Sequence, residues 1–261
     1  ADMVLPPLKV PPARKARLAP SVAPQEAVTD AGPAVDCAPV LTLAAQPGAI
    51  AQITFAATCD PGAAIAVHHA GLSITGRLSD KGTFAADLPS LQRTATVAIE
   101  LKGNIVATRT LSLPDFDRFA RVALQWQGDS GLEIHALELG ADYGMPGHVW
   151  AKAPGAVDDV LREDAGFLTR LGAGTGPTDT HAEIYSFPTL PQRQPGTVRL
   201  SVEAAVTRTT CGRKVSGRSF QNTGMGGVQQ TELTLEMPDC DTVGDILVLK
   251  NLLRDIKIAS K

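Results

Sequence analysis

Apolar and polar residues alternate most regularly along residues 197–208. One side of this segment carries the apolar residues Val198, Leu200, Val202, Ala204 and Val206. The other side carries the polar residues Thr197, Arg199, Ser201 and Glu203. Successive side chains of a strand point to opposite faces, so the pattern predicts a strand with one buried face and one wet face. We expect its neighbour in the sheet to be residues 228–237.

Residues 37–113 read as a series of short apolar segments separated by turn signals. The predicted strands cover residues 40–43, 50–55, 65–67, 72–78, 82–88, 95–101 and 105–111. Pro47-Gly48, Asp60-Pro61-Gly62 and Lys102-Gly103-Asn104 are residue combinations typical of turns. Seven short strands at this spacing, without a helical period, predict an immunoglobulin-like β-sandwich over residues 37–114.

Residues 115–261 predict a second, mostly antiparallel β domain. Besides 197–208 and 228–237, strands are expected at residues 119–126, 131–139, 167–171, 182–187 and 245–250, and around Val149. A short helix is expected within residues 156–164. The sequence leaves the topology of this domain open. The predicted fold class is therefore all-β, with two β domains in succession.

Residues 1–36 differ from the rest of the chain because prolines interrupt them throughout. Proline fixes φ and lacks an amide donor, so we expect an extended or disordered arm. Arg14, Lys15 and Arg17 form a basic cluster in its first half. The arm is either a solvated stalk, a strap laid across a partner, or a basic segment near lipid headgroups.

Composition narrows the class of protein. The chain has 261 residues, 44% of them hydrophobic and 4% aromatic, and a net charge of −3. Such a charge gives no long-range attraction to nucleic acid, so we expect no nucleic-acid partner. No apolar run approaches the roughly 18 residues of a membrane span. The first residue is Ala, which is what remains after cleavage of a leader or after trimming of an anchor, so residue 1 is no proof of a natural N-terminus.

Four cysteines, Cys37, Cys59, Cys211 and Cys240, are even in number and form no CxxC pair. The local pairing, Cys37–Cys59 with Cys211–Cys240, places one crosslink in each predicted domain; free buried thiols are the alternative. Each bridge would close a loop and stabilise the fold by about 3 kcal/mol. Paired cysteines would predict an oxidising compartment.

The motifs of enzymes and cofactor proteins are missing from the sequence. His68 and His69 are adjacent on a predicted strand and point to opposite faces, so they cannot readily chelate one ion. No GxSxG, SxxK, HExxH or Walker sequence is found. We therefore expect no catalytic residues, no cofactor and no metal.

The segment 142–150 stands out because it places Tyr143, Met145, His148 and Trp150 in one loop of a chain poor in aromatic residues. Tyr and Trp dominate the energetics of interfaces, so this loop is the predicted contact with a protein or glycan. The alternative is that Tyr143 and Trp150 only cover the end of a sheet.

Several segments of the chain resemble those of a known family. They are the opening Asp-Met-Val-Leu-Pro-Pro-Leu, the Pro-Gly-His-Val loop, and the closing Met-Pro-Asp-Cys and Val-Gly-Asp-Ile-Leu-Val-Leu-Lys-Asn-Leu. The chain resembles an uncharacterised, Rhodobacterales-like family of alphaproteobacterial envelope proteins, sometimes labelled translocases. The resemblance spans nearly the whole chain. It implies an inner-membrane anchor, a Pro-rich stalk and periplasmic β domains, and it supplies no catalytic residues.

These observations favour a non-catalytic periplasmic binding or scaffold module that is anchored in the membrane and docks onto an envelope protein complex. The first alternative is a β protein that binds a carbohydrate or another small ligand through the 142–150 loop. The second is an envelope hydrolase, which would require a pocket where a His lies within hydrogen-bond reach of a Ser or Asp.

Overall fold

The computed structural model describes residues 37–162, 165–189, 195–222 and 227–258. Within these ranges the protein is all-β, as predicted, and contains one short α-helix, α1 (Val157–Leu161). The predicted Pro-rich arm, with Arg14, Lys15 and Arg17, lies outside the described residues. From Val35 onward the chain forms one compact unit.

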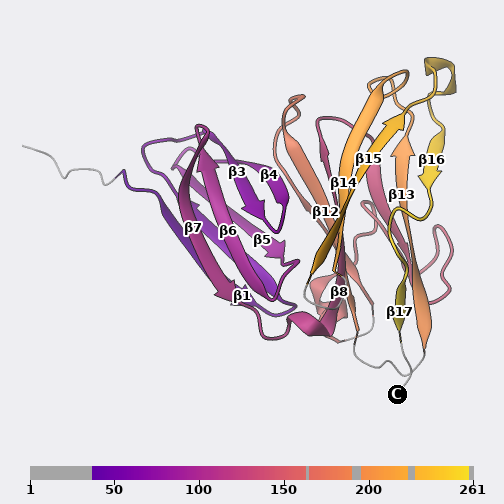
Figure 1. Cartoon of the computed structure of the whole chain (residues 1–261), viewed down its shortest axis with the longest axis horizontal. Helices are drawn as coiled ribbons and strands as arrows, with labels where there is room; N and C mark the ends of the chain where they lie inside the picture. The colour runs from indigo at the N-terminus through magenta and orange to yellow at the C-terminus, as the bar shows by residue number, and fades with distance from the viewer. Residues whose placement is uncertain (1–36, 163–164, 190–194, 223–226, 259–261) are drawn as a thin grey trace, which may run out of the picture. The chain divides into compact units, whose positions relative to one another are not determined.

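The seven strands predicted for residues 37–113 are present and form two antiparallel sheets (Figure 1). The first sheet has the order β1-β2-β5, with β1 (Val40–Gln46), β2 (Ile50–Ala56) and β5 (Thr83–Pro89). The second has the order β4-β3-β6-β7, with β3 (Ala64–His69), β4 (Leu72–Arg77), β6 (Thr94–Leu101) and β7 (Asn104–Ser112). Both sheets contribute to one apolar core, so this part is a β-sandwich.

The strand order refines the immunoglobulin-like prediction. In constant-type immunoglobulin domains the fourth strand belongs to the sheet of the first, second and fifth strands. Here β4 pairs with β3 in the other sheet. The β6–β7 hairpin turns at Lys102 and Gly103, with φ of 53° and 78°. Two consecutive positive φ values are those of a type I′ turn, whose twist matches the two strands.

The remaining strands form two five-stranded antiparallel sheets. One has the order β11-β12-β8-β14-β15, with β8 (Phe119–Gln127), β11 (Phe167–Leu171), β12 (Thr180–Pro188), β14 (Lys214–Asn222) and β15 (Val228–Glu236). The other has the order β10-β9-β13-β16, with β9 (Leu132–Leu137), β10 (His148–Val149), β13 (Gly196–Ala205) and β16 (Ile246–Leu249), and β17 (Ile256–Ile258) also pairs with β13. One core cluster joins the facing sides of the two sheets, so this part is also a sandwich.

The predicted pairing of residues 197–208 with 228–237 is wrong. Strand β13 pairs with β9, β16 and β17, whereas β15 pairs with β14. Strand β14 was missed because its sequence, KVSGRSFQN, is mostly polar. Its Gly217 faces β8, and a Cβ there would lie 2.9 Å from the carbonyl oxygen of Gln125. Alternation identifies which face of a strand is buried, but it does not identify the neighbouring strand.

Strand β8 is buried on both faces, which explains its almost continuous apolar sequence. Leu124 and Trp126 face the core of the second sandwich, whereas Ala123 belongs to the core cluster of the first. The two sandwiches therefore share packed side chains rather than meeting only through a linker. Polar contacts add to this packing, because Gln125 Oε1 accepts the backbone amide of Ser73 on edge strand β4 at 2.7 Å.

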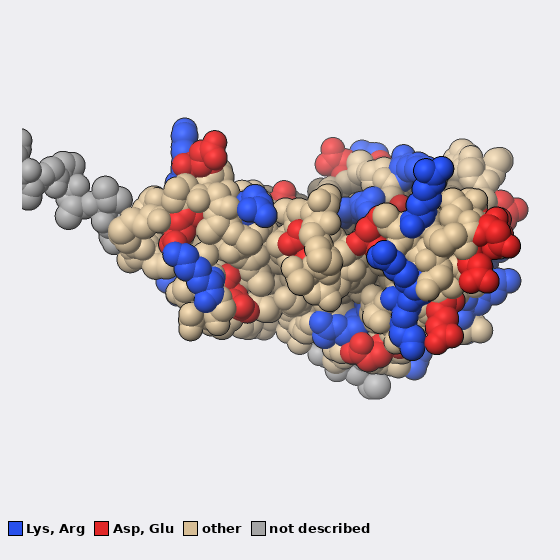
Figure 2. Space-filling view, turned by 90° about the horizontal axis from the view of Figure 1, so that it is seen from above, with Lys and Arg blue, Asp and Glu red and all other residues tan. Residues whose placement is uncertain are grey.

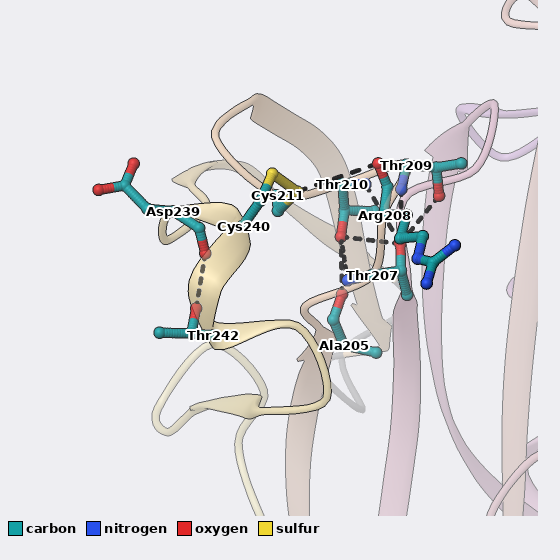
Figure 3. Close-up of a disulfide and its surroundings, with 9 residues drawn as sticks. All are labelled: Ala205, Thr207, Arg208, Thr209, Thr210, Cys211, Asp239, Cys240 and Thr242. Carbon is teal, nitrogen blue, oxygen red and sulfur yellow. Dashed lines mark hydrogen bonds between the residues drawn. A yellow bond between two sulfur atoms is a disulfide. The ribbon is translucent and has the colours of Figure 1, made fainter.

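Both predicted disulfides are present, Cys37–Cys59 and Cys211–Cys240, and all four cysteines are used. Figure 3 shows Cys211 joined to Cys240 beside a turn in which Thr210 Oγ1 donates to the carbonyl of Ala205 at 2.9 Å. The two bridges are consistent with an oxidising compartment outside the cytoplasm.

The face drawn in Figure 2 carries Lys and Arg side chains interspersed with Asp and Glu side chains, in keeping with the small net charge. No helix in the described part of the chain is long and apolar enough to cross a membrane.

Candidate functional site

The candidate site lies on the outer face of the β9–β13 sheet, which faces away from the core. In β13 the side chains of Arg199, Ser201 and Glu203 point to this face, because the alternating apolar residues enter the core. The antiparallel register places Leu137, His135 and Glu133 of β9 directly opposite them. The outer face therefore collects two carboxylates, a histidine, a hydroxyl and a guanidinium.

This face is less exposed to solvent than the alternation of apolar and polar residues predicts. Short strand β10 adds His148 beside Leu137, and the chain between β9 and β10 folds over the sheet. As a result His135, His148 and Glu203 are 4%, 7% and 6% exposed. Arg199 holds the covering segment in place by donating to the carbonyl of Ala141 at 2.7 Å.

A chain of hydrogen bonds runs through the covered face and fixes the tautomer of each histidine. The amide of Gly144 donates to His148 Nδ1 at 3.0 Å, so in the neutral ring the proton is on Nε2. His148 Nε2 lies 2.9 Å from His135 Nδ1, which must then accept that proton's hydrogen bond. The remaining proton of His135 is on Nε2, which lies 3.4 Å from Glu203 Oε2.

Tyr143 completes this network from the covering loop. Its hydroxyl donates to Glu203 Oε1 at 2.5 Å and lies 3.4 Å from Ser201 Oγ. Burial and the hydrogen bond to Glu203 raise the pKa of Tyr143. The tyrosine is therefore a neutral donor that ties the loop to the sheet, and its hydroxyl shows no activation as a nucleophile.

The rings of the site are stacked. The Trp150 ring lies 5.4 Å from His148, at an interplanar angle of 1°, and 5.1 Å from His135. Lys152 Nζ lies 5.1 Å from the centre of the Trp150 ring, a cation–π geometry. The stack restricts the orientations of both imidazole rings, so ring packing as well as hydrogen bonding keeps the two histidines in place.

Burial and neighbouring groups shift the acid–base properties of the site. Burial and the nearby His135 lower the pKa of His148, which favours the neutral form that accepts from Gly144. The hydrogen bond to His135 holds the pKa of Glu133 below its usual range. Behind the sheet, burial raises the pKa of Glu183 to about 7. Its Oε2 accepts the amide of Ile134 at 2.6 Å, which links it to β9.

The four residues predicted as partner contacts occupy one region but differ in exposure. Tyr143 and Met145 are 51% and 59% exposed at the tip of the loop. Trp150 is half-buried and His148 is buried, so these two support the loop and offer little surface. Sequence reasoning did not assign Glu203 or His135 to the site, because only the register of β9 and β13 makes them diagonal neighbours, with His135 Nε2 3.4 Å from Glu203 Oε2.

Other candidates from the sequence have structural roles. His68 Nε2 is half-buried and lies within hydrogen-bond distance of Glu100 Oε2, at 2.9 Å, and the neighbouring His69 is buried on the opposite face. His69 Nε2 lies 3.1 Å from Ser90 Oγ, within hydrogen-bond reach. The pair gives no argument for hydrolysis, because His69 and Ser90 are 2% and 0% exposed and Nε2 also accepts the amide of Leu91.

A hollow of about 510 Å³ opens beside the network, between Tyr143 and the chain from Val248 to Asp255. Its size is that of ordinary small-molecule sites. Among the described residues, no group of three or more His, Cys, Asp or Glu side chains is placed to hold a metal ion.

Comparison with known proteins places this chain in no group: no protein-family model matches its sequence, and no curated protein matches it significantly.

Proposed function

We propose that this protein is a non-catalytic binding or scaffold module of the periplasm. In its full form it is anchored in the inner membrane and docks onto an envelope protein complex. The two disulfides support an oxidising compartment. The resemblance to alphaproteobacterial envelope proteins supports the anchor and the stalk.

The observation that carries the docking proposal is an exposed aromatic tip on a rigid base. Tyr143 and Met145 project from a loop whose backbone and side chains are fixed by His148, Glu203 and Arg199. A side chain that is already ordered loses little conformational entropy on binding. Tyr is enriched among the residues that dominate binding energy, and Met adapts to irregular partner surfaces.

Site-specific crosslinking in cells tests this proposal. A photoreactive amino acid replaces Met145 in the full-length protein, and a matched protein carries it at Ile105, which is 55% exposed on β7. We expect a defined crosslinked protein from position 145 and none from position 105. Tyr143→Ser should abolish the crosslink. Equal crosslinking at both positions, or a product that survives Tyr143→Ser, would contradict the proposal.

A second candidate function is the binding of a carbohydrate or another small ligand, and the hollow beside Tyr143 favours it. Glycan binding through the aromatic stack should fall after Trp150→Ala, because Trp150 supplies the largest ring of the stack. Unchanged glycan-array binding by this variant would remove the aromatic stack from consideration. A function as an envelope hydrolase has the least support, because the His69–Ser90 pair is buried and does not reach solvent.

A further inference from the structure

The hollow beside Tyr143 exists because the edge of the sheet is interrupted. Strand β16 pairs with residues Val202 to Ala205 of β13, and β17 pairs with Gly196 to Val198. Between these two pairings the chain leaves the sheet, and the amide of Leu200 donates to Asp255 Oδ1 at 2.9 Å. The carboxylate replaces a strand partner, so the departing chain forms a wall around an open space.

Several residues that line the hollow are apolar. Leu137, Leu200, Val248 and Leu253 line it. Leu200 and Leu253 are buried, whereas Val248 is 46% exposed although it lies on a strand. Exposed apolar surface at the mouth of a concave site is typical of a surface that a ligand covers.

The lining also carries cations, although the whole chain has a net charge of −3. Arg199, Lys250 and Arg254 line the hollow together with a single carboxylate, Asp255. Arg199 is paired with Asp142 at 3.0 Å, and Asp255 is engaged by the amide of Leu200. No ion pair involves Lys250 or Arg254 within the described ranges, so both charges are available to a ligand.

Ser201 also lines the hollow and provides a hydroxyl there. Its described side-chain contact is the distant one to the Tyr143 hydroxyl, whose own proton is donated to Glu203. Ser201 is therefore the donor in this 3.4 Å contact, and its hydroxyl can donate to an oxygen atom in the hollow by rotating away from Tyr143. A ligand that satisfies all of these groups needs a negatively charged oxygen at one end and an apolar body at the other.

We propose that this hollow is a binding site for a small monocarboxylate with a short aliphatic chain. Lys250 and Arg254 bind the carboxylate, Ser201 donates a hydrogen bond, and the aliphatic chain covers Val248 and Leu253. A singly charged head group fits better than a doubly charged phosphate, because Asp255 in the wall would repel the additional charge. This site does not depend on the docking proposal, since it needs no partner protein.

Titration of the purified full chain with hexanoate, followed by amide NMR, tests the site. Hexanol, which lacks the charge, and acetate, which lacks the chain, serve as comparison ligands. We expect hexanoate to shift the amides of Ser201, Val248 and Leu253 and to bind at least about tenfold more tightly than either comparison ligand. Hexanol lacks the charge-assisted hydrogen bond, which is worth about 1.5 kcal/mol or more. Acetate lacks the methylene groups that bury apolar surface.

The double variant Lys250→Gln/Arg254→Gln should weaken hexanoate binding by about tenfold or more. The matched control is Lys81→Gln/Arg109→Gln, which removes two exposed charges from the first sandwich and should bind as the unmodified protein does. Amide spectra of both variants check that they are folded. If about 10 mM hexanoate shifts no amide, its binding is weaker than any useful affinity. That result would overturn the proposal. Equal binding of hexanol, or undiminished binding by the pocket variant, would do the same.

Discussion

Arg121 Nη1 donates to the carbonyl oxygen of Ser90 at 2.7 Å, which joins a strand of the second sandwich to a turn of the first. The guanidinium is fully buried and also binds the carbonyls of Gly48 and Ala49 and the hydroxyl of Ser186. Asp115 accepts the amides of the same two turn residues, Gly48 and Ala49. The Arg121 guanidinium thus binds the carbonyl oxygens of this turn, and the Asp115 carboxylate accepts hydrogen bonds from its amides.

The turn itself needs this support. Ala49 has φ of 52°, in the left-handed region that costs a residue with a Cβ about 1 kcal/mol or more, and it is fully buried. Burial lowers the pKa of Arg121 to about 9, so it remains charged at neutral pH. The joint between the two sandwiches is therefore a specific polar contact inside a shared core.

We predict that Arg121→Met destabilises the whole chain. Three carbonyls and one hydroxyl would lose a charged donor in a place that water does not reach, at a cost of about 3 kcal/mol. Urea unfolding measures the loss. Arg109→Met is the control, because Arg109 is exposed on β7 and should change stability by less than about 0.5 kcal/mol. Equal midpoints for the two variants would refute the role given to Arg121.

Glu183 should make stability depend on pH between its ordinary pKa of 4.5 and its folded pKa of about 7. Over this interval the folded protein binds more protons than the unfolded chain, so the free energy of unfolding falls as pH rises. Glu183→Gln removes this dependence, and at pH 8 it should be more stable than the unmodified protein by about 3 kcal/mol.

Urea unfolding at pH 4 and pH 8 checks this prediction, with exposed Glu232→Gln as the control. At pH 4 the Glu183 variant and the unmodified protein should be equally stable, since both side chains are then neutral. A Glu183→Gln variant that is less stable at pH 8 would show that its carboxylate is favourable in the fold.

Acidification should loosen the loop that covers the candidate site. The pKa of His148 is lowered, so as pH falls below 6.5 the unfolded state takes up protons first and the folded state loses stability. Once protonated on Nδ1, His148 can no longer accept from Gly144. Hydrogen-exchange protection of the Gly144 amide should decrease between pH 7 and pH 5.

His148→Asn separates this effect from general acid destabilisation. The Asn side-chain oxygen lies close to the position of Nδ1 and does not titrate, so protection of Gly144 should then be independent of pH. A decrease in protection that persists in His148→Asn would assign the pH dependence to another group.

Each disulfide should contribute about 3 kcal/mol to the free energy of unfolding. The bridges span 22 and 29 residues, and closing a loop of this length restricts the unfolded chain by about that amount. The double variants Cys37→Ala/Cys59→Ala and Cys211→Ala/Cys240→Ala, measured in urea, give the two values separately. Added reductant should lower the urea midpoint of the unmodified protein. An unchanged midpoint would contradict the stabilising role of the bridges.

The local pattern of apolar, polar and turn-forming residues was sufficient to predict most strands and turns of this chain. Alternation identified the buried face of β13, and Lys102-Gly103 identified a tight hairpin. The local disulfide pairing, favoured because it places one bridge in each predicted domain, is confirmed, whereas the alternative of free thiols is not. Strands β14 and β17 were missed, because a strand that is mostly polar or only three residues long has too few positions to show a period.

The residues of the candidate site also differ in whether the sequence could predict them. Tyr143 and Trp150 could be singled out because they lie in one loop of a chain poor in aromatic residues. Glu203 was expected on a wet face and is 6% exposed, because a loop that begins more than 60 residues earlier covers it. The cationic hollow was not predicted, because it depends on where β16 and β17 leave the edge of β13.

The sequence by itself determined that the chain folds as β-strands and which faces they bury, and it favoured the local cysteine pairing, because these properties depend on side-chain period and short separations along the chain. The tertiary structure alone decided that His135 lies beside Glu203, that Arg121 crosses between the sandwiches and that Lys250 and Arg254 share a hollow. Strand register and neighbour order arise from contacts between distant segments, and alternation along one strand carries no information about them.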